Sequence, residues 1–594
     1  MVKRRKTQNS RKKNEWKYNG SGSSRHNGQK KTEFSVNWPE WAVQAYLFMM
    51  LGVFPLYFQD KFFHLGDVKY IFFRTVTILL MAVLSIELAV IGILKVYCSD
   101  RGMADCFQSV FRWGEMKKRL KRLSVTDIGM LVWLGFALLS WILSEDREAA
   151  WIGAPNWYMG LLTQLLLVGV YFAVSRFCSC REWLFWVMAG SGGLVFLTAY
   201  LHRFSIDPFG LRDGKFDLGY LGPIGNANFH STYVCILLSV MMGVYVILRR
   251  ERTKEARLRR GMAALVIFLG FCTAVTQNSD SIYVGLGITF LFLLWFALED
   301  GIVWKRYMEL WILAVSAARV TGVLQNAFPE KVPLLNRLSL AVTKGWAGWL
   351  VLAAVLLAYG GTCLALKRGV KTGNMIGGKA VRLRGAVFVP LAAGAVCMLI
   401  LMGLSITGIF PRADSEWQER LSELIWRRDN GRRTIWTLCA DAFGAYPLFR
   451  KLFGCGPDLL GCHLETYHGA LVQAVWGEAI LRNAHNEWLN SVMNYGILGG
   501  GAYLFLFAAA SIRCIKNRKR QPVLLAAAAA IPAYMGHDFF CFQQTVCAPL
   551  IFIVIGMAES LMRKNLHRKP AGYCSGATIP QGVTCMQCVK SRVM

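Results

Sequence analysis

Charged side chains are scarce in this sequence, and acidic ones are the scarcest. Only 17% of the 594 residues are charged, against about 25% in typical soluble proteins, and 36 acidic residues stand against 67 Lys and Arg. Hydrophobic residues make up 55% of the chain, and the mean hydropathy is +0.37. This composition excludes a string of soluble domains, because so much apolar surface has to face lipid.

The positive charge, +31 in total, forms no continuous basic face. It lies in short runs between long apolar stretches, which is typical of a polytopic membrane protein and not of a nucleic-acid-binding domain. We therefore expect membrane lipid, and no nucleic acid, among the partners.

Several cofactor and metal signatures are missing. The sequence has no Walker motif, no G-x-G-x-x-G fingerprint and no H-E-x-x-H, so coupling to ATP and zinc-dependent hydrolysis lack support. Its 17 cysteines follow no framework spacing, and Cys585 and Cys588 have no second pair nearby to complete a zinc site. The sequence does not decide whether Cys455 and Cys462 form a disulfide. We expect neither a cofactor nor a metal.

Fourteen segments are apolar and long enough to cross a bilayer, for which about 20 helical residues suffice. The sequence thus predicts an all-α fold, a polytopic transmembrane bundle of about 12–14 helices. The predicted spans are 41–58, 70–97, 127–143, 158–175, 183–201, 224–248, 261–277, 281–298, 306–325, 345–366, 385–410, 487–512, 522–540 and 546–562.

Clusters of Lys and Arg set the orientation, because short loops rich in them stay in the cytoplasm. Residues 1–33 carry eleven basic residues, and further clusters follow the second, sixth, tenth and twelfth spans. All fall on one side if every span is kept, including the ninth with its Arg306, Glu309 and Arg319. We expect both termini in the cytoplasm. The predicted regions are a basic disordered tail over 1–36, spans 1 to 11 within 37–410, spans 12 to 14 within 487–563, and a tail over 564–594.

Residues 411–486 are the one long hydrophilic stretch, and this topology places them outside. They carry nine basic and nine acidic residues, unlike the cytoplasmic clusters. A connection of this length is usually functional or disordered, and its Trp, Leu, Ile and Phe content argues against disorder. We expect a large external catalytic loop of short amphipathic helices at the membrane-water interface.

The sharpest local pattern is Ala-His-Asn-Glu-Trp-Leu over 484–489, where the external loop enters the twelfth span. A histidine at this boundary has an ordinary pKa near 6.5, so His485 can accept a proton from a hydroxyl at neutral pH. A histidine that only caps or anchors the start of the helix would give the same pattern.

A second pattern places four arginines within seven residues, at 427, 428, 432 and 433, just before Trp436. Such a cluster can hold phosphate oxygens bidentately while the tryptophan anchors the segment in the interface. The alternative is a solvated helix face whose arginines pair with Glu416, Glu419 and Glu423.

Three polar features lie at the predicted ends of other spans or within one. Asn226 and Asn228 belong to a Gly-Asn-Ala-Asn-Phe turn, in which amides can bind sugar or phosphate oxygens or simply cap a helix. Asp280 lies in a tight turn between the seventh and eighth spans. Arg319 falls inside the ninth span, where a charge is costly unless it is paired, snorkels or faces a water-filled cavity.

Five patterns follow one another in order: residues 225–229, residues 279–281, Arg432 with Trp436, residues 447–448 with 454–457, and residues 484–486 with 496–499. Together they resemble the O-antigen ligase and O-antigen polymerase family, which includes protein O-oligosaccharyltransferases. One departure is Asp280, because the family usually has arginine in this turn. Asp280 could orient an acceptor hydroxyl instead, or Arg319 could supply the missing charge.

The resemblance implies metal-independent transfer of a glycan from an undecaprenyl-diphosphate carrier to a glycan, lipid or protein hydroxyl. The reaction would take place at the outer face of the bacterial cytoplasmic membrane, in polysaccharide biosynthesis for the cell envelope. On this hypothesis His485 is the base that activates the acceptor, and Arg432 clamps the diphosphate. The expected substrate-binding residues are Asn486, Arg433, Arg319, Asn226, Asn228, Asp280 and Trp436.

Two other classes of protein remain as alternatives. A transporter or flippase of a lipid-linked or polysaccharide substrate would show internal repeats and interrupted helices with binding near the midplane. The sequence shows no obvious repeat, and its polar motifs gather at the outer edge. A nonenzymatic scaffold is the second alternative, suggested by Asp280.

Overall fold

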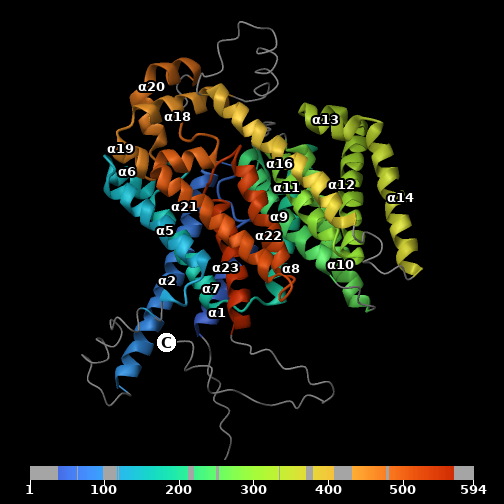
Figure 1. Cartoon of the computed structure of the whole chain (residues 1–594), viewed down its shortest axis with the longest axis horizontal. Coiled ribbons are helices and arrows are strands. Elements are labelled where there is room, and N and C mark those ends of the chain that lie inside the picture. Colours follow the sequence, from blue (N-terminus) through green and yellow to red (C-terminus); the bar gives the residue numbers. More distant parts are fainter. Residues whose placement is uncertain are drawn as a thin grey trace, which may run out of the picture. The chain divides into compact units, whose positions relative to one another are not determined.

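Helices dominate the part of the chain that the structure describes (Figure 1). The computed structural model describes residues 38–62, 64–97, 117, 120–211, 220–248, 253–277, 279–332, 335–368, 379–406, 431–476 and 481–566. Apart from Trp38, these residues belong to the unit Pro39–Met594. The predicted tail 1–36, nearly all of the tail 564–594, Arg427, Arg428 and the cysteines at 585 and 588 lie outside the described residues.

The first half of the chain contains most of the membrane-length helices and one small ribbon. In this ribbon two-residue strands pair antiparallel, with Leu221 opposite Gly225. The elements are α1 (Trp38–Phe48), the π-helix η1 (Met49–Val53), α2 (Leu65–Tyr97), α5 (Val125–Ile142), α6 (Arg147–Ile152), α7 (Leu161–Phe177), α8 (Glu182–Arg203), β1 (Tyr220–Leu221), the 3₁₀ helix η2 (Gly222–Ile224), β2 (Gly225–Asn226), α9 (Ala227–Ile247) and α10 (Lys254–Thr276).

The second half adds long helices on either side of a group of short ones. The elements are α11 (Ser281–Ala297), α12 (Gly301–Ala327), the 3₁₀ helix η3 (Pro329–Lys331), α13 (Arg337–Lys344), α14 (Ala347–Lys367), α16 (Lys379–Ile406), α18 (Arg432–Ala445), α19 (Leu448–Phe453), α20 (Leu460–Trp476), α21 (Glu487–Asn517), α22 (Leu524–Asp538) and α23 (Ala548–Leu566).

The predicted all-α polytopic bundle is confirmed. Each of the fourteen predicted spans overlaps a helix, although the first covers only part of α1, then η1 and a turn, and nine helices among the described residues are long and apolar enough to cross a membrane. The apolar helices α7 and α11 have 17 residues each and fall just short of that length. The chain is therefore a multi-pass membrane protein.

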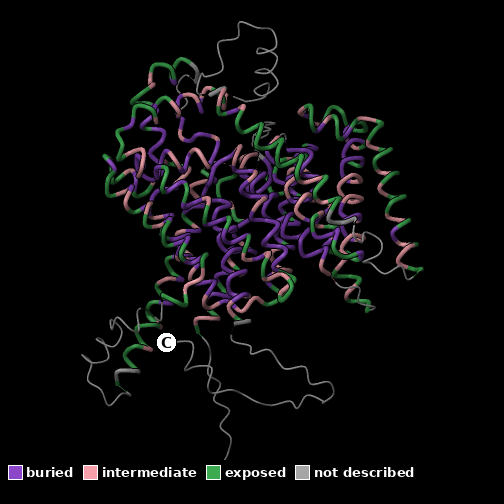
Figure 2. Tube along the Cα trace, in the orientation of Figure 1, coloured by how far each residue is buried: buried purple, intermediate pink, exposed green. Residues whose placement is uncertain are grey.

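The centre of the bundle is built around α9 and α22, which pack against each other. In α9, 89% of the apolar stretch is buried inside the protein. Small residues allow this close approach, since a side chain on Gly243 would collide with the backbone of Ala526. In contrast, α2, α14 and α16 leave most of their apolar residues exposed, as Figure 2 shows, and these are the surfaces suited to lipid.

The ninth predicted span is the continuous helix α12, and its charges have partners. Arg306 pairs with Glu309 at 2.7 Å, and Glu309 also accepts hydrogen bonds from the hydroxyls of Tyr245 and Tyr359. A buried ion pair surrounded by hydrogen-bond donors removes most of the cost that made this span look doubtful.

The predicted external loop contains three short helices within its described residues 431–476 and 481–486. One face of α18 is apolar and buried, with Ile435, Trp436, Leu438, Cys439 and Ala442. These side chains join those of α20 and of the segment before α21 in a second apolar core. Figure 1 shows α18, α19 and α20 grouped beside α21. Short helices are thus present at these residues, and α18 is amphipathic.

Candidate functional site

One end of the bundle gathers most of the sequence motifs. Here α9, α11 and α21 begin and α22 ends, and we call it the motif end. At the opposite end, Arg513 pairs with Glu559 and Arg518 with Glu299. The basic residues at the end of α21 and the motifs at its start thus lie at opposite ends of this helix.

Trp436 attaches α18 to the loop that carries His485. Its ring is buried, and its indole N–H donates a 2.8 Å hydrogen bond to the carbonyl of Ala484. The ring also packs edge-on against Phe539, with 5.7 Å between the centroids. The predicted anchor residue is therefore buried in protein, and it fixes the register between α18 and the 481–487 loop.

The structure brings Arg432 and His485 together across one short segment, residues 539–542. The Arg432 guanidinium donates to the Phe540 carbonyl at 3.1 Å. The His485 ring meets Phe542 edge-on, with 5.1 Å between the centroids. Arg432 is also close enough to His485 for its charge to act on the imidazole. The two predicted catalytic residues thus belong to one site.

The surroundings of His485 keep its imidazole neutral. Burial, followed by the positive charge of Arg432, lowers the pKa of His485 to about 4. The residue has a left-handed backbone conformation, with φ of 47°, and its N–H donates to the side chain of Asn483 at 3.0 Å. A non-glycine residue in this region is strained, which is a feature common at functional sites.

Two neighbours of His485 hold the start of α21 in place. The amide oxygen of Asn486 accepts from the backbone N–H groups of Trp488 and Leu489 and so caps the helix. Glu487 is buried and accepts from the Gln543 backbone at 2.8 Å and from the Ser491 hydroxyl at 3.1 Å. Asn486, a predicted substrate-binding residue, thus positions the loop through its side-chain oxygen.

The glycine-rich motifs pack against each other behind this loop. The N–H groups of Cys455 and Gly456 donate to the carbonyls of Met493 and Asn494, both at 3.1 Å. Gly496 kinks α21 with φ of 74°, and a side chain there would overlap the backbone of α19. Only glycine allows this approach. Cys455 and Cys462 are free thiols, one buried and one exposed, so the open question of a disulfide is answered in the negative.

A small polar cavity of about 10 Å³ lies beside Phe542, the ring that contacts His485. Its lining includes Asp458, Glu487, Asn490 and the ring of Phe542. The Asp458 carboxylate accepts from the backbone of Ala154 at 2.8 Å, and burial raises its pKa to about 7. The cavity is the size of a single water molecule.

The predicted asparagines of α9 lie at the same end. Asn226 caps α9 by accepting from the Asn228 N–H at 2.8 Å. The next turn is tied to the segment after α22, because the Cys547 thiol donates to the Phe229 carbonyl at 3.2 Å. Phe542 touches both Phe229 and Trp157 as well as His485. Half-buried Asn228 is thus near the site, whereas the Asn226 oxygen is used in the cap.

The remaining predicted residues lie elsewhere. Arg433 follows Arg432 but is exposed. Asp280 accepts from the Asn336 amide at 2.7 Å, at the corner between α11 and α13. Arg319 donates to the Gly345 carbonyl at 2.6 Å and lies over Trp349, so its described contacts are in the turn between α13 and α14. No described contact of Arg319 therefore brings its charge to Arg432 or to the turn of Asp280.

Sequence reasoning missed the segment from 537 to 547. It supplies the carbonyl that Arg432 contacts, the ring against His485 and the backbone donor to Glu487. Its sequence, HDFFCFQQTVC, has no helical periodicity and matches no expected motif. The two adjacent titratable residues His537 and Asp538, at the end of a span, were the signal that could have found it.

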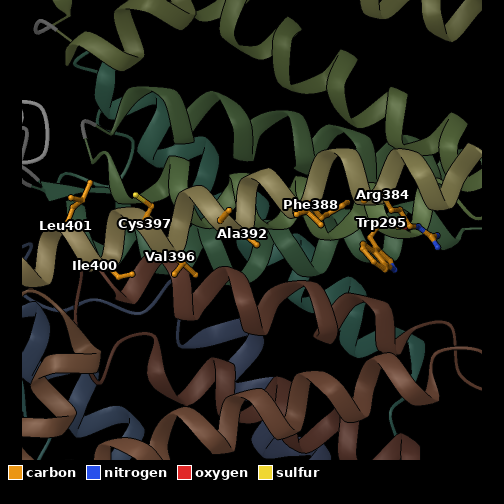
Figure 3. Close-up of a pocket in the computed structure, with 11 residues that line it drawn as sticks. Trp295, Arg384, Phe388, Ala392, Val396, Cys397, Ile400 and Leu401 are labelled. Atoms are coloured by element: carbon orange, nitrogen blue, oxygen red, sulfur yellow. The ribbon is translucent and has the colours of Figure 1, made fainter.

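An open apolar groove of about 930 Å³ runs along α16 (Figure 3). Phe388, Ala392, Val396 and other residues of α16 line it from Arg384 to Leu401, with Trp295 of α11 beside Arg384. These α16 residues span roughly 26 Å at the rise of an α-helix. The next residue, Met402, is buried in the apolar core of α18. The groove thus leads toward the helix that begins with Arg432.

No family model matches this chain, and the search of curated proteins found no match either.

Proposed function

We propose that the protein is an integral membrane glycosyltransferase that transfers or polymerises glycan from an undecaprenyl-diphosphate carrier. The observation that carries this proposal is the meeting of His485 and Arg432 across residues 539–542 at the motif end. A neutral imidazole and a guanidinium next to each other are the two groups that this transfer needs.

In the proposed reaction, the oxygen of an acceptor hydroxyl attacks the anomeric carbon of the donor glycan. His485 takes the hydroxyl proton while the bond from the anomeric carbon to the diphosphate oxygen breaks. The diphosphate leaves with the electron pair, and Arg432 stabilises the negative charge that develops on it. His485 is neutral at pH 7. The negative charge of the bound donor raises its pKa and makes it a stronger base.

Two further features support a lipid-linked donor at the outer face of a bacterial cytoplasmic membrane. The basic residues at the end opposite to His485, among them Arg513 and Arg518, agree with a cytoplasmic location for that end. The groove along α16 has the apolar lining and roughly the length that a hydrocarbon chain in a bilayer requires. Its end near α18 would place a diphosphate head close to Arg432. The acceptor is a glycan, lipid or protein hydroxyl.

The test is transfer in proteoliposomes that contain the carrier-linked glycan and an acceptor, with release of the free carrier as the readout. His485→Ala and Arg432→Gln should each lower the rate by roughly 10²-fold or more. The matched controls are His64→Ala and Arg257→Gln, both at exposed residues, which should keep near-normal rates. Glycan movement across the membrane without carrier release, unchanged in His485→Ala, would instead identify a transporter.

A further inference from the structure

Three side chains with metal-ligating atoms meet where α22 ends. His537 and Asp538 are the last two residues before the turn, and Cys541 follows three residues later. All three are fully buried. One ligand atom from each lies within 4.8 Å of the others. This cluster borders the proposed catalytic site, because Phe540, the contact of Arg432, lies within the same turn.

The hydrogen bonds of this cluster do not satisfy all of its buried polar atoms. His537 Nδ1 lies 3.1 Å from Oδ1 of Asp538, and His537 Nε2 lies 3.1 Å from the Ser281 hydroxyl. The other oxygen of Asp538, Oδ2, is wholly buried and has no hydrogen bond of normal geometry among the described residues, although the Tyr534 hydroxyl lies close to this carboxylate. Among the described residues no Lys or Arg forms an ion pair with Asp538. A buried carboxylate without a compensating positive charge is costly. A bound cation would compensate it.

We propose that His537, Asp538 and Cys541 form a binding site for one zinc-class divalent cation. Imidazole nitrogen, carboxylate oxygen and thiolate sulfur together are typical ligands of Zn²⁺, whereas Mg²⁺ and Ca²⁺ prefer oxygen alone. The Cys541 thiol releases its proton on binding. A divalent cation with one carboxylate and one thiolate then has no net charge, which suits a buried site.

Ser281 acts as the outer support of this site. With the metal on Nδ1 of His537, the ring carries its proton on Nε2 and donates it to the Ser281 hydroxyl. Such a second hydrogen bond fixes the tautomer and the orientation of a ligating histidine. Ser281 is the first residue of α11, so the metal would fasten the end of α22 to the start of α11.

The proposal goes beyond the proposed function, since no step of glycan transfer passes through the metal. The role of the metal is to hold the turn that presents the Phe540 carbonyl to Arg432 and the Phe542 ring to His485. Metal binding can therefore be measured whether or not the protein transfers glycan.

The experiment uses the full-length protein in detergent, stripped with a chelator and titrated with Zn²⁺ and then with Co²⁺ as a spectroscopic probe. We expect one metal per chain and a thiolate-to-cobalt charge-transfer band in the near ultraviolet. Cys541→Ser should abolish the band and Asp538→Asn should weaken binding. Ser281→Ala should weaken binding about tenfold, as outer-shell changes do.

Cys547→Ser is the matched control. Cys547 is also buried, and its thiol donates to the Phe229 carbonyl, but it is not one of the three clustered residues. It should bind cobalt as the wild type does. Absence of the band in the folded wild type would overturn the proposal and leave only a hydrogen-bonded Ser281–His537–Asp538 chain, and so would a band that survives Cys541→Ser. The wild-type titration decides the question even if a variant does not fold.

Discussion

Replacing Arg432 with glutamine should raise the pKa of His485. The folded protein lowers this pKa from an ordinary value of 6.5 to about 4, with burial as the larger cause and the charge of Arg432 as the second. The whole difference corresponds to about 3 kcal/mol between the two protonation states. Because burial is the larger cause, Arg432 accounts for less than half of it. We expect an increase of less than about 1.2 pH units in Arg432→Gln.

Two assays report this change. Diethylpyrocarbonate modifies only neutral imidazole, so the pH dependence of His485 modification, followed by mass spectrometry, gives its pKa without any need for catalysis. The acid limb of kcat/KM for transfer reports the same group in the free enzyme. Both should move to higher pH in Arg432→Gln, because loss of a neighbouring positive charge favours the imidazolium.

The control is Arg433→Gln, which removes the same charge from the next residue on an exposed position. It should shift the pKa of His485 much less. Adding 0.5 M salt should reduce this small shift further, since exposed charges are screened. An unchanged or lower pKa in Arg432→Gln would refute the reasoning, because it would mean that the guanidinium does not act on the imidazole.

Three further predictions concern the surroundings of the site. Burial raises the pKa of Asp458 from 3.8 to about 7, so its contribution to stability falls as the pH rises from about 4 to about 7. Asp458→Asn should therefore raise the melting temperature at pH 8 and have little effect at pH 4. In Gly496→Ala the new side chain would sit at φ of 74° and overlap its neighbours. Chemical denaturation should show a loss of at least about 2 kcal/mol of unfolding free energy. The control Gly501→Ala, whose side chain meets open space, should show no loss. Ala392→Trp should fill the groove along α16 and raise the KM for a polyprenyl donor several-fold without changing that for a short-chain analogue; an equal effect from Ala395→Trp, which is exposed and does not line the groove, would show that the groove is not used.

The sequence could predict the fold because a bilayer imposes a length and an apolar composition on each span. Even α12, with Arg306 and Glu309, obeyed this rule, since the two charges pair inside the bundle. The face of α18 that carries Trp436 was also predictable from its helical spacing. These features are determined by residues close together in the sequence, so the sequence alone suffices to predict them.

The site was only partly predictable, because residue type does not reveal which of several possible partners a side chain takes. His485 and Arg432 do come together, yet Asn486 and Asn226 use their amide oxygens to cap helices. Asparagine directly before a helix is a preferred cap, so that signal was present in the sequence. The segment from 537 to 547 could not be found this way, since its contacts with Arg432 and Glu487 exist only in the packed bundle.

The glycine motifs explain how a loop between helices can hold His485 in place. Gly496 lets α21 kink against α19, and Gly454 lets the following turn pass within contact of Asn494. These contacts fix the end of α21 at which Asn486 and His485 lie, while Trp436 fixes the loop from the other side. A displacement of about 1 Å at a reacting group can cost about 10²-fold in rate. If the proposed function is right, motifs that contact no substrate are therefore as necessary for transfer as the imidazole itself.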